Sequence, residues 1–269
     1  MLNILYFCSL HTQNMIGIIT LSIVPMRADQ SERSEMISQL LFGEEVEVLK
    51  VSPPWLKVKN VSDGYEGWVD IKMVDLIAAD SLNSDKRILA KPFITVINVR
   101  DRQKMFLSAG SVIGPISDNR FKLGCDWFEL SDNSGLFLPF YSKHNLIAVA
   151  IQFLNTPYLW GGKSIFGVDC SGLVQLAYSI CGVQLPRDAS QQIAVGMPID
   201  SLDNVQEGDL AFFSNSEGDV THVGILLSNT EIIHASGCVK IDRIDKQGII
   251  SSITGEYLYS LHAIRRVKD

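Results

Sequence analysis

A cysteine and two histidines in the C-terminal half of the chain have the types and spacing of a nucleophile with its base. Cys170 lies in "DCSG", just before an apolar stripe that begins at Leu173 and predicts a helix. We therefore expect the cysteine at or just before the N-terminus of that helix, where unpaired N–H groups and the helix dipole stabilise a thiolate and lower its pKa. Such a thiolate attacks a carbonyl carbon when a nearby base takes the thiol proton.

His222 and His234 belong to two consecutive predicted strands that the residues "SNT" separate. If these three residues close a hairpin in which position 227 faces 231, the two histidines are diagonal neighbours on one face. A two-residue loop would place the rings on opposite faces, so the arrangement depends on this register. On one face, one imidazole can take the thiol proton while the other orients it, as the third member of a catalytic triad does.

Two other interpretations of the same residues stay open at this level. The histidines could be unrelated core or surface side chains. A zinc site made of Cys170, His222, His234 and Cys238 is a further alternative, which the lack of paired ligand spacings disfavours. By contrast, Cys181 lies on the apolar stripe of the predicted helix, so we expect it to be an inert core residue.

The elements around these residues change in character at Ser142. The stretch "SKHNLIAVAIQFLN" has apolar positions at helical spacing, with Ser142 as the candidate N-cap. The pattern recurs in "SGLVQLAYSICG" and ends at Gly182, a candidate C′ residue. A short helix in "RDASQQIAVG" and a run of strands follow. Helices followed by an antiparallel run of strands indicate an α+β domain.

The N-terminal half of the sequence is a succession of short strand patterns. Alternating or β-branched runs, divided by turn residues, occupy 15–79 and return in 87–140. Strands this short are typical of a small barrel, and the two segments look like loose repeats. The polar stretch "DSLNSDK" between them predicts a linker. We therefore place domains at 1–80, 81–142 and 143–269.

Bulk composition limits the class of protein. The chain has 269 residues, of which 46% are hydrophobic and 20% charged, so we expect a packed protein of two or three domains. The net charge of -7 argues against a nucleic-acid partner and against binding to anionic membranes through a polybasic segment. Five irregularly spaced cysteines suggest reduced thiols rather than a disulfide framework. A monomer is favoured.

The first residues bear on localisation. The N-terminus lacks a basic segment, and polar "HTQN" interrupts its apolar run, so it is a poor signal peptide and too broken for a membrane span. We expect the cytoplasm, with the periplasm or secretion as the alternative.

Three separated motifs, "TPYLWGG", "DCSGLVQ" and "HVGI" with "IHAS" downstream, resemble the NlpC/P60 cysteine peptidases over 143–269. That family has a papain-like fold and cleaves bacterial cell-wall peptides. The resemblance implies that Cys170 is the nucleophile, His222 the base and His234 the polar residue that orients it. It also implies that Tyr158 lies near the nucleophile, where it helps the backbone N–H of Cys170 to stabilise the oxyanion. No metal or organic cofactor is implied.

The N-terminal barrels resemble bacterial SH3-like domains. The stretches "RSEMISQLLFGE" and "DGYEGWVD" are similar to the first such domain of peptidases that hydrolyse γ-D-glutamyl-diamino acid bonds in released muropeptides. The resemblance implies that this domain forms one side of the substrate cleft. It also implies that carboxylates and hydroxyls bind the free amine of an N-terminal L-Ala. The candidate ligands of the amine are Glu35, Tyr65, Asp169, Ser171 and Asp188. Arg187 is a candidate ligand of the α-carboxylate of D-Glu.

The sequence thus predicts an α+β papain-like catalytic domain preceded by two small all-β SH3-like barrels. The predicted function is cysteine endopeptidase activity on the γ-D-glutamyl-diamino acid bond of cell-wall peptides, in peptidoglycan turnover or recycling. One alternative is a non-catalytic cell-wall-binding protein with a degenerate peptidase domain, which the intact Cys, His and His set disfavours. Another is a thiol amidase or acyltransferase of the same fold, and the cysteine-before-histidine order favours the peptidase.

Overall fold

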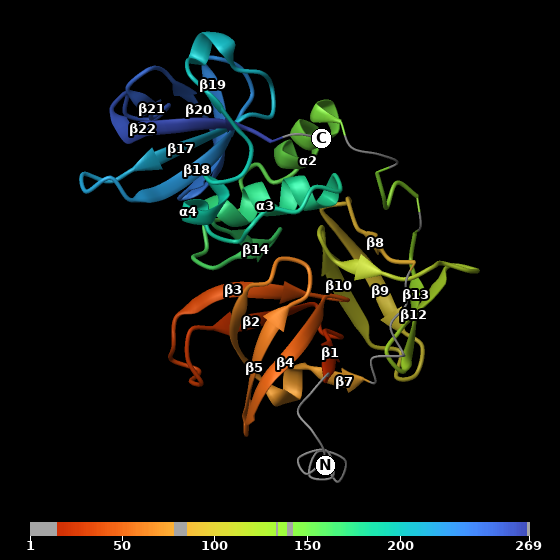
Figure 1. Cartoon of the computed structure of the whole chain (residues 1–269). Helices are drawn as coiled ribbons and strands as arrows, with labels where there is room; N and C mark the ends of the chain where they lie inside the picture. The colour runs from red at the N-terminus through yellow and green to blue at the C-terminus, as the bar shows by residue number, and fades with distance from the viewer. Residues whose placement is uncertain (1–14, 78–84, 133, 139–141, 268–269) are drawn as a thin grey trace. The chain divides into compact units, whose positions relative to one another are not determined.

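The structure, a computed structural model, describes residues 15–77, 85–132, 134–138 and 142–267. The chain, drawn in Figure 1, divides into two compact units, Met1–Leu136 and Phe137–Asp269. Each unit has its own cluster of buried apolar side chains. The first 14 residues lie outside the described part, as does most of the predicted linker. In the described part, no helix combines the length and the apolar character that crossing a membrane requires. The domain limits placed at 80/81 and 142/143 stay predictions.

The first half of unit 1 is a seven-stranded antiparallel sheet with the order β3-β2-β6-β5-β4-β1-β7. Its strands are short, and their inward side chains form one apolar cluster that includes Val24, Leu40 and Leu56. The alternation that the sequence shows is kept in "WLKVKN", where Leu56 and Val58 are buried. The strands are β1 (Ile16–Ile18), β2 (Ile23–Arg27), β3 (Met36–Leu41), β4 (Glu45–Ser52), β5 (Trp55–Asn60), β6 (Glu66–Asp70) and β7 (Asp75–Ile77), with a 3-10 turn η1 (Ile71–Met73).

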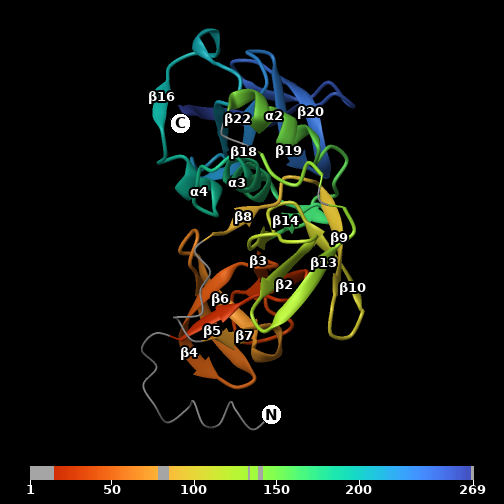
Figure 2. The same ribbon diagram turned by 90° about the vertical axis from the view of Figure 1, so that its right-hand side faces the viewer.

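The second half of unit 1 is a four-stranded sheet, β10-β9-β13-β12, beside a two-stranded pair, β11-β8. Its strands are β8 (Arg87–Ile88), β9 (Phe93–Asn98), β10 (Lys104–Ser108), β11 (Val112–Ile113), β12 (Arg120–Leu123) and β13 (Asp126–Leu130) (Figure 2). This part is all-β, as expected. The two halves of unit 1 resemble each other only loosely, because Trp55 in the first half is buried whereas Trp127 in the second is half exposed.

One aromatic side chain joins the two halves of unit 1. Phe42, which follows β3, is fully buried and meets Phe121 and Phe128 edge-on at ring distances of 6.0 and 5.1 Å. The next residue, Gly43, has a φ of +81°, and a Cβ there would collide with the carbonyl oxygen of Val112. Only glycine suits both demands, so the chain can turn here and keep Phe42 inside.

Unit 2 begins with helices and ends with a sheet, which is the α+β order expected. The helices are α2 (Lys143–Ile151), α3 (Cys170–Ile180) and α4 (Ala189–Gln192). Ser142 is the N-cap of α2, and its side chain accepts the N–H of Asn145 at 3.0 Å, as predicted. Helix α3 ends as predicted, with Gly182 at a φ of +89°, and Cys181 is buried in the core.

The sheet of unit 2 has seven strands in the order β16-β22-β17-β18-β19-β20-β21. Helix α3 packs against β18, β19 and α2 (Figure 2). Its side chains are buried almost all round. The strands are β16 (Met197–Ile199), β17 (Leu210–Ser214), β18 (Val220–Leu226), β19 (Glu231–Ser236), β20 (Cys238–Ile244), β21 (Gly248–Ile250) and β22 (Tyr257–Arg266), with a short pair β14 (Lys163–Ser164) and β15 (Gly167–Val168) and a 3-10 turn η3 (Leu202–Asn204).

Candidate active site

The two histidines are hydrogen-bonded to each other on one face of the sheet. Strand β18 pairs with β19 so that Leu226 faces Ile232, which is the register of the three-residue loop expected from the sequence. His222 Nε2 lies 2.9 Å from His234 Nδ1, and both rings are buried. The hypothesis of two unrelated histidines is therefore wrong.

The hydrogen-bonded chain of His222 and His234, here called the relay, continues to a carboxylate that was not predicted from the sequence. His234 Nε2 lies 3.0 Å from Oδ2 of Asp242 on β20, and both side chains are fully buried. In the register of β19 with β20, His234 faces Lys240, so Asp242 is the diagonal neighbour of His234 on the same face. The signal was present in "VKIDRI", where Lys240 and Asp242 alternate with Val239 and Ile241 along the strand.

This geometry contradicts the zinc alternative. His234 uses one ring nitrogen toward His222 and the other toward Asp242. A metal ligand needs a free lone pair on a ring nitrogen, which His234 does not have in this arrangement.

Burial determines the charge of each member of the relay. It lowers the pKa of His222 to about 3, with further lowering by His234 and Lys240. It also lowers the pKa of His234, although Asp242 acts in the opposite direction. Burial tends to raise the pKa of Asp242, but hydrogen bonds from Ser252, His234 and Lys240 outweigh it and bring the pKa to about 2. At neutral pH the carboxylate is therefore ionised and both imidazoles are neutral.

A tyrosine holds the ring of His222 in place. The ring of Tyr259 on β22 stacks on that imidazole at a centroid distance of 4.0 Å and an interplanar angle of 8°. The Tyr259 hydroxyl is in turn 3.0 Å from the hydroxyl of Ser236. The imidazole is thus fixed by stacking on one face and by His234 at its edge, so its Nδ1 has a defined direction.

Cys170 is the first residue of α3. Asp169 caps the helix by accepting the N–H of Gly172 at 2.7 Å. The Cys170 sulfur receives hydrogen bonds from the backbone N–H groups of Ser171 and Val223. Because Val223 directly follows His222, these contacts bring the thiol to the start of the strand segment that carries the imidazole.

The expected low pKa of this thiol is not found. Burial raises the pKa of Cys170 to about 11, and the carboxylate of Asp169 adds to the increase, against the opposing effect of the two backbone N–H groups and Arg187. The helix start is where the sequence placed it, but a thiolate there would be shut off from water. The resting site therefore holds a neutral thiol and a neutral imidazole.

Three of the predicted ligands, Asp169, Ser171 and Arg187, form a buried network with one another. Arg187 is 1% exposed, and its guanidinium contacts Asp169 at 2.6 and 3.0 Å and the Ser171 hydroxyl at 2.9 Å. Asp169 also accepts the N–H of Gly161 at 2.9 Å. These contacts support a structural role at the start of α3, and the ligand role that the resemblance implied stays a prediction.

Tyr158 lies near the thiol. It forms a parallel bridge with Val168, just before Cys170, and its N–H donates to the carbonyl of Gly237 at 2.9 Å. Burial raises its pKa, and the charge of a Cys170 thiolate raises it further. The hydroxyl therefore stays protonated and can donate a hydrogen bond to an oxyanion.

The remaining predicted ligands occupy different units. Asp188 is half-buried and precedes α4 without capping it through its side chain. Glu35 is exposed before β3, and Tyr65 is half-buried against the core cluster of the first sheet. Because Glu35 and Tyr65 belong to unit 1, their role as ligands stays a prediction.

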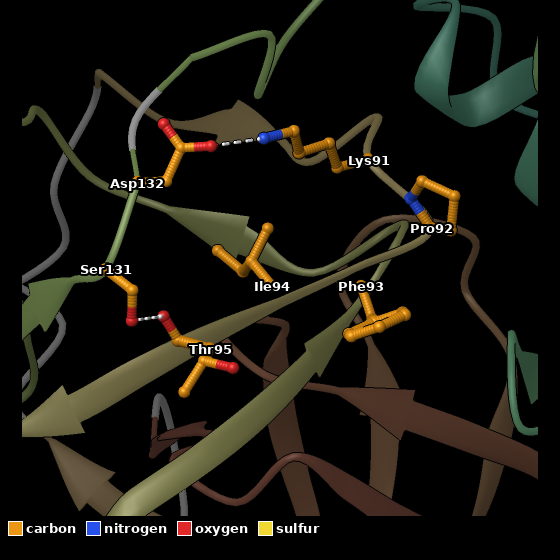
Figure 3. Close-up of a pocket in the computed structure, with 7 residues that line it drawn as sticks. All are labelled: Lys91, Pro92, Phe93, Ile94, Thr95, Ser131 and Asp132. Carbon is orange, nitrogen blue, oxygen red and sulfur yellow. Dashed lines mark hydrogen bonds and ion pairs between the residues drawn. The ribbon is translucent and has the colours of Figure 1, made fainter.

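A separate pocket lies on the second half of unit 1 (Figure 3). Its volume is about 320 Å³, and Lys91 and Asp132 on its wall are paired with each other at 2.7 Å. None of the residues of the relay lines it. It is a surface hollow of the β unit and not the site of the thiol chemistry.

A thiol at a helix start, with an imidazole relay on an adjoining antiparallel sheet, is an arrangement that suits a cysteine peptidase. Residues 155–258 match the NlpC/P60 family, and residues 26–73 match the bacterial dipeptidyl-peptidase SH3 domain. The chain therefore contains an NlpC/P60 cysteine peptidase domain, with a bacterial dipeptidyl-peptidase SH3 domain on its N-terminal side. A second SH3-like barrel at 81–142 stays a prediction.

Similar proteins align along most of the chain. Dipeptidyl-peptidase 6 of Lysinibacillus sphaericus is 26% identical over 87% of this chain and 93% of its own length. A gamma-D-glutamyl-L-lysine dipeptidyl-peptidase of Bacillus cereus is 29% identical over 84% of this chain and 76% of its own. The crystal structure of an NlpC/P60 family protein from Bacillus cereus covers 93% of this chain and 99% of its own, with a TM-score of 0.80 at 22% identity, which shows a shared fold.

Proposed function

We propose that this peptidase hydrolyses the γ-D-glutamyl-diamino acid bond of bacterial cell-wall peptides that have a free N-terminal L-Ala, in peptidoglycan turnover or recycling. The observation that carries the proposal is the buried hydrogen-bonded line of His222, His234 and Asp242, together with a Cys170 thiol that is bonded to the backbone N–H of Val223, the residue after His222. Support for the substrate class comes from relatives named as gamma-D-glutamyl-L-lysine dipeptidyl-peptidases in Bacillus cereus and Bacillus subtilis.

The reaction begins with transfer of the thiol proton. His222 takes the proton of Cys170 on Nδ1, because its Nε2 is engaged with His234. The sulfur then bonds to the carbonyl carbon of the γ-D-glutamyl amide, and the carbonyl oxygen becomes an oxyanion. The Cys170 N–H and the Tyr158 hydroxyl are the donors that we assign to this oxyanion.

The second half of the reaction returns the site to its starting state. The His222 imidazolium donates its proton to the nitrogen of the diamino acid, and the C–N bond breaks to leave a thioester on Cys170. Water attacks the thioester as His222 takes one of its protons, and the C–S bond breaks. The His222 imidazolium returns its proton to the sulfur, which restores the thiol and the neutral imidazole, and the γ-D-glutamyl carboxylic acid loses its remaining proton to water and leaves as a carboxylate.

Recognition of a free amine calls for carboxylates and hydroxyls, because an ammonium group only donates hydrogen bonds. Asp188, which directly precedes α4 in unit 2, is the residue that we assign to it. In this assignment the ammonium of L-Ala is an anchor that sets the distance to the scissile bond. Peptides without this group are therefore expected to bind weakly.

A pair of substrates tests the proposal. L-Ala-γ-D-Glu-meso-diaminopimelate and its N-acetylated form are incubated with the full chain, and the products are measured by mass spectrometry. We expect release of diaminopimelate from the free peptide and at least about tenfold slower release from the acetylated one, equivalent to about 1.4 kcal/mol of lost transition-state binding. Equal rates would overturn the assigned amine recognition. Lack of any cleavage, with transfer to an added amine instead, would favour an acyltransferase.

A further inference from the structure

The relay of imidazoles ends at a carboxylate that is held from several sides. Oδ2 of Asp242 lies 3.0 Å from His234 Nε2 and 3.2 Å from the ammonium of Lys240. Its Oδ1 accepts the N–H of Ser252 at 2.9 Å. The side chain is completely buried, so these contacts fix its position relative to the ring of His234.

An ionised carboxylate only accepts hydrogen bonds, so the proton between Asp242 and His234 must be on His234 Nε2. A neutral imidazole carries one ring proton, so His234 Nδ1 then has a lone pair. His222 Nε2, at 2.9 Å, must therefore donate its proton to that lone pair. The same count leaves His222 Nδ1 unprotonated, which is the state that a base needs.

We propose that Asp242 is a positioning residue that sets the tautomers of both imidazoles, so that His222 presents a bare Nδ1 to the Cys170 thiol. The inference rests on the proposed function for its kinetic consequence alone. It extends the Cys, His and His set that the sequence suggests to a fourth member, which touches neither the substrate nor the thiol.

An amide in place of the carboxylate would reverse this order. An asparagine NH₂ at position 242 can donate to His234 Nε2, which moves the proton of His234 to Nδ1. His222 Nε2 would then accept, and its proton would move to Nδ1. Such a ring cannot take the thiol proton. The charge of Asp242 also opposes Lys240, whose ammonium disfavours a charged His222.

Nuclear magnetic resonance of the full chain labelled with ¹⁵N-histidine tests the tautomers directly at neutral pH. Nitrogen shifts distinguish protonated from bare ring nitrogens, and histidine substitutions assign the signals. We expect the wild type to have protons on Nε2 of both His222 and His234. In Asp242→Asn we expect the proton of His222 on Nδ1. The matched control is Asp245→Asn, which removes a half-buried carboxylate bonded to Tyr257 and should leave the wild-type pattern.

Kinetics with the peptide substrate give the second readout. We expect kcat of Asp242→Asn to fall by about 10²- to 10⁴-fold, in line with a wrong tautomer in a catalytic triad, and KM to change little. Asp245→Asn should keep the wild-type kcat. A wild-type His222 with its proton on Nδ1 overturns the inference, and so does a folded Asp242→Asn with unchanged tautomers and kcat within threefold of the wild type.

The wild-type spectrum needs no variant, so it decides the matter even if Asp242→Asn does not fold. It also needs no substrate. If the tautomers are as expected and the peptide is not cleaved, the proposed function fails and the inference about Asp242 stands. If the peptide is cleaved and the tautomers are reversed, the proposed function stands and the inference fails.

Discussion

The Cys170 thiol and the His222 imidazole are both neutral near neutral pH. Burial raises the pKa of Cys170 to about 11 and lowers that of His222 to about 3. A preformed thiolate-imidazolium pair would need the opposite order of these two values. The proton is therefore transferred as the substrate is attacked, and His222 acts as a general base rather than as the counterion of a standing thiolate.

Alkylation of Cys170 by iodoacetamide reports the state of the thiol, because only the thiolate reacts. With a pKa near 11, the rate should rise about tenfold for each pH unit between pH 7 and 9. The experiment uses a Cys125→Ala background to remove an exposed competing thiol, and mass spectrometry follows the peptide that contains Cys170. A rate that is constant from pH 6 upward would instead indicate a thiolate with a lowered pKa.

The buried neutral histidines also make stability depend on pH. The pKa of His222 is about 3 in the folded chain and 6.5 in the unfolded one, so the unfolded chain binds more protons between these values. The contribution of His222 to the free energy of unfolding is therefore fully present above about pH 6.5, and it is lost as the pH falls towards 3. His222→Gln should flatten this dependence in urea titrations, whereas His144→Gln, at an exposed position on α2, should not. Identical pH dependence in wild type and His222→Gln would contradict the account.

At the scale of elements, three neighbouring strands arrange the relay. His222 lies on β18, His234 on β19 and Asp242 on β20. The register of β18 with β19 brings the two histidines together, and the register of β19 with β20 brings Asp242 next to His234. Gly224 lies opposite His234, where a Cβ would come within 2.9 Å of the Cβ of that histidine. The absence of a side chain at Gly224 therefore leaves room for His234 and its imidazole ring.

Gly224→Ala tests that constraint. The added methyl group would also lie 2.7 Å from Cδ1 of Ile232, so the strand or the ring must shift. We expect a loss of stability of about 1–3 kcal/mol, as for other overpacked cores, together with lower activity. Thr221→Ala, at an exposed position of the same strand, is the matched control. Chemical denaturation measures both, and equal stability of the two variants would count against the role of Gly224.

Several of these features could be predicted from the sequence because they depend on local periodicity. The apolar stripe after Leu173 placed Cys170 at a helix start, and a three-residue loop set the register of the histidines. Asp242 was missed because the pairing of β19 with β20 decides whether an alternating strand faces solvent or a buried ring. The predicted lowering of the Cys170 pKa was wrong, because the burial that raises this pKa depends on tertiary packing, which the sequence does not show.

At the scale of the whole molecule, each unit has its own core, so damage to one core should leave the other intact. Phe42→Ala removes the aromatic contact between the halves of unit 1, and we expect a loss of about 3–5 kcal/mol. Phe93→Ala, at a half-exposed position, is the control and should cost little. Tryptophan fluorescence follows unfolding, since Trp55, Trp68 and Trp127 lie in unit 1. Equal losses in the two variants would contradict the assigned core.

The central claim is that Cys170 is the nucleophile of a peptidase, and one comparison tests it most directly. The rates at which Cys170→Ala and Cys125→Ala release diaminopimelate from L-Ala-γ-D-Glu-meso-diaminopimelate are measured by mass spectrometry on folded protein. The account predicts that Cys125→Ala, which alters an exposed thiol, keeps the wild-type rate. It predicts that Cys170→Ala loses at least about 10³-fold of that rate, as in triads that lack their nucleophile. Cleavage by Cys170→Ala at the rate of Cys125→Ala would contradict it.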